Sequence, residues 1–167
     1  MISYKDIFTD LEMITDDYKM RLVDDVIYEV DCKLINIYNG SQLHDPVDSD
    51  EDNENVIEVN DVIHNFDLSG EIELTDGRQA FMELFRGYMR KVQKDLKDNK
   101  PEELETFRNG SNKYLSHKVG PSINNFRFYL SLFTNETDTM PVMVKHLDDG
   151  TPLYACFWKH GLYEEEK

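Results

Sequence analysis

Three aspartates at alternate positions, Asp48, Asp50 and Asp52, form the pattern in this sequence that comes nearest to a metal site. Carboxylates at this spacing open the calcium-binding loop of helix-loop-helix proteins. The rest of that loop is missing, because Asn53 stands where the pattern needs glycine and Val59 where it needs a bidentate glutamate. The stretch therefore predicts weak Ca²⁺ binding at best. The plainer interpretation is a charged loop that keeps the protein in solution.

Four basic residues further along the chain have a helical spacing. Steps of four, four and three residues place them on one face of a helix, opposite an apolar face that includes Phe85 and Tyr88. A basic face in a chain of formal net charge −16 could attract an acidic segment of a partner protein. The alternative is an ordinary solvated face that the chain's own acids balance. The four predicted partner-binding residues are Arg86, Arg90, Lys94 and Lys97.

Short motifs of catalysis are absent from the sequence. It contains no Walker A loop, no G-x-G-x-x-G and no G-x-S-x-G elbow. The histidines are scattered without the spacing of metal ligands. Cys32 and Cys156 lie far apart in apolar strand patterns, which is typical of reduced core thiols. We therefore expect no enzyme, no catalytic residues and no required cofactor.

Negative charge dominates the chain and limits its partners. There are 34 acidic and 18 basic residues, and residues 34–77 carry acids but no Lys or Arg. Nucleic-acid binding needs clustered cations, so sequence-specific recognition of nucleic acid is not expected. No apolar run approaches the roughly 20 residues of a membrane span, and the N-terminal residues do not form a signal peptide. These features predict a cytoplasmic protein without membrane insertion.

Two kinds of element must position these residues. Short β-branched and aromatic runs predict strands at 25–30, 34–38, 62–68, 126–133, 141–147 and 153–158, with a hairpin turn at Gly150. Apolar residues at three- and four-residue steps predict a helix over 77–98, capped by Asp76. Pro101 begins a second helix that reaches about residue 120, weakened midway at Asn109-Gly110.

The predicted fold class is α+β, in one domain over residues 1–167. It is a bent, mostly antiparallel β domain with an inserted helical hairpin at 77–120 and a flexible acidic loop at 39–58. The loop prediction follows from its high negative charge and its few apolar residues.

Several sequence blocks, in order from end to end, resemble one known family. They are MISYKDIF at 1–8, LVDDVIYEVDC at 22–32, GYMRKV at 87–92, DGTP at 149–152 and WKHGL at 158–162. With these blocks the chain resembles the translationally controlled tumour protein family, and most closely its fungal members. Two family signatures are degenerate: residues 43–49 replace the loop motif, and Asn135-Glu136 replaces a Gly-Glu pair.

The resemblance implies a non-enzymatic interaction protein with a fold similar to that of a small-GTPase chaperone. It implies association with translation elongation factors and ribosomes, with a small GTPase and with tubulin. Glu12 matches the position that the family implicates in GTPase contact, and the helical hairpin resembles a docking surface for elongation-factor subunits and tubulin. The alternative is a calcium-responsive, chaperone-like or cytoskeleton-binding scaffold, in which the acidic loop matters more than any GTPase.

Overall fold

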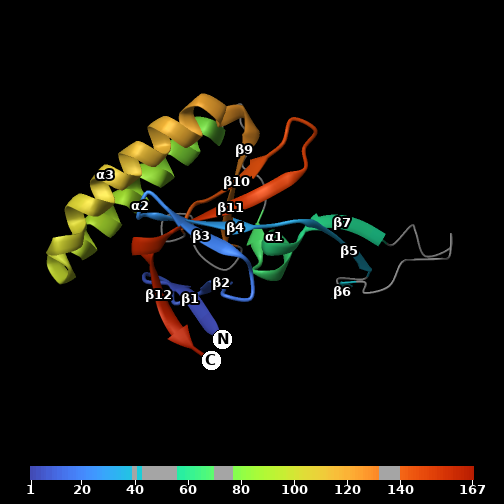
Figure 1. The fold of residues 1–167 in the computed structure, drawn as a ribbon, viewed down its shortest axis with the longest axis horizontal. Coiled ribbons are helices and arrows are strands. Elements are labelled where there is room, and N and C mark those ends of the chain that lie inside the picture. Colours follow the sequence, from blue (N-terminus) through green and yellow to red (C-terminus); the bar gives the residue numbers. More distant parts are fainter. Residues whose placement is uncertain (39–40, 43–55, 70–76, 132–139) are drawn as a thin grey trace.

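The computed structural model describes residues 1–38, 41–42, 56–69, 77–131 and 140–167. Every strand pair among these residues is antiparallel, and a helical hairpin packs beside the sheets (Figure 1). The predicted α+β class, with a mostly antiparallel β domain and an inserted hairpin, is confirmed. The two ends of the chain lie side by side (Figure 1).

The largest sheet in the described residues has the strand order β3-β4-β11-β10-β9-β8. The predicted strands at 25–30, 126–133, 141–147 and 153–158 belong to it as far as the structure describes them, and Gly150 takes a positive φ of 90° in the turn between β10 and β11. The bounds are β3 Met20–Val23, β4 Ile27–Asp31, β8 Leu68–Ser69, β9 Phe126–Ser131, β10 Val142–His146 and β11 Pro152–Trp158.

Two smaller sheets flank the large one. The first joins the two chain ends in the order β12-β1-β2, and the second has the order β6-β5-β7. The bounds are β1 Ile2–Asp6, β2 Glu12–Thr15, β5 Leu34–Tyr38, β6 Ser41–Gln42, β7 Val56–Asn60 and β12 Leu162–Glu166.

The helical hairpin contains α2, Gly77–Asn99, and α3, Leu104–Tyr114. A 3₁₀ turn at Pro101–Glu103 joins them, and a π-helical turn at Leu115–Val119 and a 3₁₀ segment at Gly120–Asn125 follow α3. The apolar stripe of α2 is buried as its periodicity predicts. Phe85 of this stripe and Phe107 of α3 pack against Trp158, with ring centroids 5.2 and 6.3 Å away. The predicted cap at Asp76 lies outside the described residues.

The prediction of a strand over 62–68 is wrong. Residues Asp61–Asn65 form a short helix, α1, and only Leu68 and Ser69 pair as β8. The side chain of Asn60 accepts hydrogen bonds from the backbone N–H groups of Val62 and Ile63, which caps the helix. This local cap outweighs the alternating apolar pattern that indicated a strand.

The predicted weak point at Asn109-Gly110 lies inside the second helix, α3. The helix α3 continues through it, and Gly110 is buried against the β3–β4 turn. A Cβ atom at Gly110 would overlap the carbonyl oxygen of Asp24 and the side chain of Val26. The glycine therefore permits a close approach of helix and sheet, and its lower helix propensity is the smaller effect.

The predicted acidic loop at 39–58 falls largely outside the described residues. At its C-terminal end the structure differs from the prediction, because residues 56–58 belong to β7. The β-branched residues Ile57 and Val59 stand opposite Ile37 and Ile35 of β5, which favours strand pairing at this end.

Candidate interaction surfaces

The four predicted partner-binding residues form one exposed face of α2. All four are exposed, whereas Phe85, Tyr88, Val92 and Leu96 on the other side of the helix are buried. None of the four forms an ion pair with another described residue. Their charges are therefore available to a partner at the protein surface. We call Arg86, Arg90, Lys94 and Lys97 the basic face of α2.

Glu12, the predicted GTPase-contact residue, lies in β2 and is already paired. The Ser3 hydroxyl donates to its Oε2 atom at 2.5 Å, and the Lys167 ammonium lies 2.5 Å from the same oxygen. Burial raises the pKa of Glu12, but the hydrogen bonds from Lys167 and Ser3 outweigh it, so that pKa lies below its ordinary value. The side chain keeps 29% of its surface exposed. A partner would have to compete with Lys167 for this carboxylate.

The predicted calcium-binding residues, Asp48, Asp50 and Asp52, lie outside the described residues. Within the described ranges, no group of three or more His, Cys, Asp or Glu side chains is placed to hold a metal ion. The two predicted sites that the structure describes are not joined: Glu12 and the basic face lie on different elements, and no hydrogen bond or ion pair between described residues connects them.

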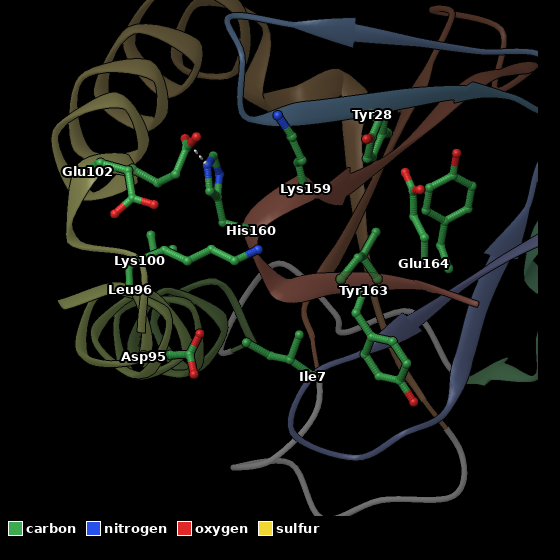
Figure 2. A pocket seen from close by; sticks show the side chains of 13 residues that line it. Ile7, Tyr28, Asp95, Leu96, Lys100, Glu102, Lys159, His160, Tyr163 and Glu164 are labelled. Atoms are coloured by element: carbon green, nitrogen blue, oxygen red, sulfur yellow. Dashed lines mark hydrogen bonds and ion pairs between the residues drawn. The ribbon is translucent and has the colours of Figure 1, made fainter. Parts of the chain in front are cut away.

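A groove of about 650 Å³ lies between the hairpin and the β12-β1-β2 sheet (Figure 2). Tyr4 of β1 and Tyr28 of β4 contribute its aromatic surface, with ring centroids 5.5 Å apart. Leu96 of α2 and Leu162 and Glu164 of β12 line it as well. Burial raises the pKa of both tyrosines, so their hydroxyls stay protonated at neutral pH.

His160 occupies the hairpin end of this groove. Its Nε2 atom lies 3.2 Å from Oε2 of Glu103, and its ring packs 5.3 Å from that of Phe107. Burial lowers the pKa of His160 and, with the charges of Lys159 and Lys100, outweighs the opposing hydrogen bond with Glu103. The ring is therefore neutral at pH 7 and donates its Nε2–H to the Glu103 carboxylate.

Glu29 of β4 forms a buried polar cluster beneath the C-terminal end of α3. Its side chain is only 1% exposed, yet it accepts a hydrogen bond from Tyr114 at 2.7 Å and pairs with Arg21 at 2.9 Å and Lys118 at 3.1 Å. The Tyr114 hydroxyl also lies 3.2 Å from the Cys156 sulfur. The cluster joins the hairpin to the large sheet, because Arg21 and Glu29 come from strands and the other partners from the hairpin.

The thiols of Cys32 and Cys156 are both free and buried, as their strand patterns predict. Burial raises the pKa of Cys32 to about 11 and that of Cys156 to about 12. Both are therefore neutral core groups at physiological pH.

The groove and the Glu29 cluster were missed in the sequence analysis. The groove draws Tyr4, Tyr28, Lys100, His160 and Glu164 from four separate parts of the chain, so no spacing marks it. Glu29 had one available signal: it is an acid between Tyr28 and Val30 in a predicted apolar strand, and a buried carboxylate requires a partner.

Comparisons with known proteins agree with this architecture. A family model described as "Translationally controlled tumour protein" matches residues 1–163. Homologues of that protein are 35% identical in Saccharomyces cerevisiae and 33% identical in Yarrowia lipolytica, and each match covers 99% of both chains. The solved structure of the tumour-associated protein p23fyp from Schizosaccharomyces pombe aligns over 100% of both chains with a TM-score of 0.77 and 26% identity. Among the helices that the structure describes, none has the length and hydropathy of a membrane span.

Proposed function

This chain belongs to the translationally controlled tumour protein family, and from that membership we propose that it is a cytoplasmic, translation-associated interaction protein. It binds elongation factors and ribosomes and modulates the nucleotide cycle of a small GTPase. Tubulin is a further partner of the hairpin. The proposal requires no catalytic residue and no cofactor, and any Ca²⁺ binding by the acidic loop is weak.

The basic face of α2 is the observation that carries this proposal. It presents four cations that no described acid neutralises, on a protein of net charge −16. Exposed charges at an interface rim accelerate association and select the partner, and their effect falls with ionic strength. The fitting partner surface is an acidic segment, which the remainder of this acidic chain would repel.

Glu12 supplies the proposed GTPase contact by exchanging its ion-pair partner within the chain for one on the GTPase. A cation of the GTPase would replace Lys167 at the carboxylate, while Ser3 continues to hold it in place. Tighter binding to one nucleotide state of the GTPase shifts its population toward that state.

The test is affinity capture from a cytosolic lysate with the purified chain, quantified by mass spectrometry. Arg90→Glu/Lys94→Glu should reduce recovery of elongation factors and ribosomal proteins by about tenfold, equivalent to ~1.4 kcal/mol of binding. The matched control is Lys19→Glu/Lys33→Glu, which reverses two exposed lysines away from the hairpin. Equal recovery with both double variants, or no translation component with the wild type, contradicts the proposal.

The GTPase arm needs its own assay. Release of a fluorescent nucleotide from the purified GTPase is followed with the wild type and with Glu12→Gln, which removes the charge and retains an acceptor for Ser3. The variant should have a smaller effect on nucleotide release. An unchanged rate would mean that Glu12 plays no part in the contact.

A further inference from the structure

One edge of strand β12 has no partner among the described residues. In that part of the chain, β12 pairs with β1 alone. At the two ends of this pairing the N–H of Ile7 donates to the carbonyl of Gly161, and the N–H of Lys167 donates to the carbonyl of Met1. Hydrogen-bonded pairs alternate along an antiparallel ladder. The odd-numbered residues of β12 therefore bond to β1, and the even-numbered ones direct their backbone groups the other way.

Glu164 is the centre of this open edge. The N–H of Leu162 is already used in the 3₁₀ turn, where it donates to the carbonyl of Lys159. The carbonyl of Leu162 and both backbone groups of Glu164 have no backbone partner among the described residues. Such a row of donors and acceptors is a template for a further strand.

The groove runs beside this edge and supplies side-chain contacts for an added strand. Leu162 and Glu164 line the groove together with Tyr4 and Tyr28, which form its apolar floor. In an added strand, every second side chain would point toward this floor. Aromatic or aliphatic residues at those positions would bury apolar surface that the half-buried side chains of Tyr28 and Leu162 now leave exposed.

Charged side chains of both signs line the groove. Lys100 and Lys159 lie at the hairpin end near His160, and Glu164 lies further along β12 (Figure 2). Lys100, Lys159 and Glu164 form no ion pair with a described residue. Acids lie at the hairpin end as well: Glu103 bonds to His160, and the carboxylate of Asp95 accepts a hydrogen bond from Asn99. Glu102 also lines the groove and is exposed.

A second copy of this chain does not fit the open edge. Antiparallel pairing of two copies about Glu164 would place the two Glu164 side chains opposite each other, with Glu165 and Glu166 of both copies close by. Like charges opposite each other destabilise a strand pair, and such charges commonly protect exposed edges from self-association. A partner strand with a basic side chain near Glu164 avoids this repulsion.

We propose that the open edge of β12 binds an extended peptide segment of another protein by strand addition. Three side chains of the bound peptide face the groove. An acidic one lies against Lys100 and Lys159, an apolar one packs on Tyr4 and Tyr28, and a basic one lies against Glu164. This surface differs from both the basic face of α2 and Glu12, so the proposal stands independently of the function proposed above.

The probe is a synthetic peptide, acetyl-Thr-Asp-Thr-Phe-Thr-Lys-Thr-amide, together with its reversed sequence, which presents the same groups in the opposite strand direction. Titration into the ¹⁵N-labelled full chain is followed by NMR. One of the two peptides should shift the amide signals of Glu164 and Glu166 and slow hydrogen exchange at the Glu164 amide, whose N–H points away from β1. If neither peptide shifts these amides at about 1 mM, or if the shifts map to α2, the proposal is wrong.

Two N-methylated forms of the binding peptide test backbone pairing. One carries methyl groups on the amides of Asp, Phe and Lys, and the other on those of the inner Thr residues. An added strand uses alternate amides toward its neighbour, so one form should lose binding and the other should keep it. Retention of binding by both forms would show that the peptide uses side chains alone and would overturn strand addition.

Two charge variants of the chain test the side-chain contacts. Lys100→Glu/Lys159→Glu and Glu164→Lys should each weaken peptide binding about tenfold, whereas Lys19→Glu/Lys33→Glu should leave it unchanged. Glu164 is exposed, so its replacement leaves the fold intact, which circular dichroism checks. Equal loss with the control pair would reduce the effect to the net charge of the protein and contradict the proposed contacts.

Discussion

At the scale of single residues, Glu12 shows how a proposed contact residue also stabilises the fold. Ser3 is fully buried, and its hydroxyl donates to the Glu12 carboxylate. Glu12→Val removes that acceptor and should lower the free energy of unfolding by about 1–2 kcal/mol, while Glu12→Gln should cost less. Urea unfolding of the two variants measures the difference. Equal stability of Glu12→Val and the wild type would mean that the Ser3 contact contributes nothing.

His160 makes a residue-scale prediction about pH. Burial depresses its pKa below the ordinary 6.5 in the folded protein, so the unfolded chain binds the proton more readily. The resulting stability is complete above pH 6.5 and is lost as pH falls toward the folded-state pKa. His160→Gln should therefore flatten the decline in unfolding free energy as the pH falls below 6.5. An unchanged pH profile, or an NMR titration of His160 with a midpoint above 6.5, would contradict this.

At the scale of elements, the contact of α3 with the β3–β4 turn depends on Gly110. Gly110→Ala should gain helix propensity but force the new methyl group against Asp24 and Val26, for a net loss of about 1–3 kcal/mol. Gly87→Ala in α2 is the matched control, because nothing lies within 4 Å of a Cβ atom there. This control should stabilise the protein by about 0.5–1 kcal/mol. Thermal unfolding of both variants measures the two effects, and equal shifts would show that the close approach is not limiting.

The elements also show what the sequence could and could not predict. The buried stripe of α2 and the β10–β11 hairpin were predictable, because periodicity and Gly150 are local signals. The structure of residues 62–68 was not predictable, because the Asn60 side chain caps a helix where the alternation of apolar residues indicated a strand. The basic face of α2 followed from its spacing alone. The groove could not be predicted, because tertiary packing brings Tyr4, Tyr28 and His160 together from distant segments.

At the scale of the whole molecule, acidic charge is concentrated in one part of the chain and basic charge is exposed on the hairpin. The net charge of −16 makes the folded state repel itself, whereas the basic face of α2 attracts acidic partners. Both effects are electrostatic and act between exposed groups, so salt screens both. Screening should therefore have opposite consequences for stability and for binding.

A single salt series tests this opposition. Between 20 and about 500 mM NaCl the Debye length falls from roughly 20 to about 4 Å, which removes long-range repulsion. The melting temperature should rise by about 2–4 °C if the relief is worth about 1 kcal/mol, while capture of elongation factors through the basic face declines over the same range. Arg90→Glu/Lys94→Glu should show a rise in melting temperature at least as large, because the variant is more acidic, but little residual capture to lose. A melting temperature that falls with salt would mean that the ion pairs of the fold, such as the Glu29 cluster, outweigh the repulsion of its excess acids.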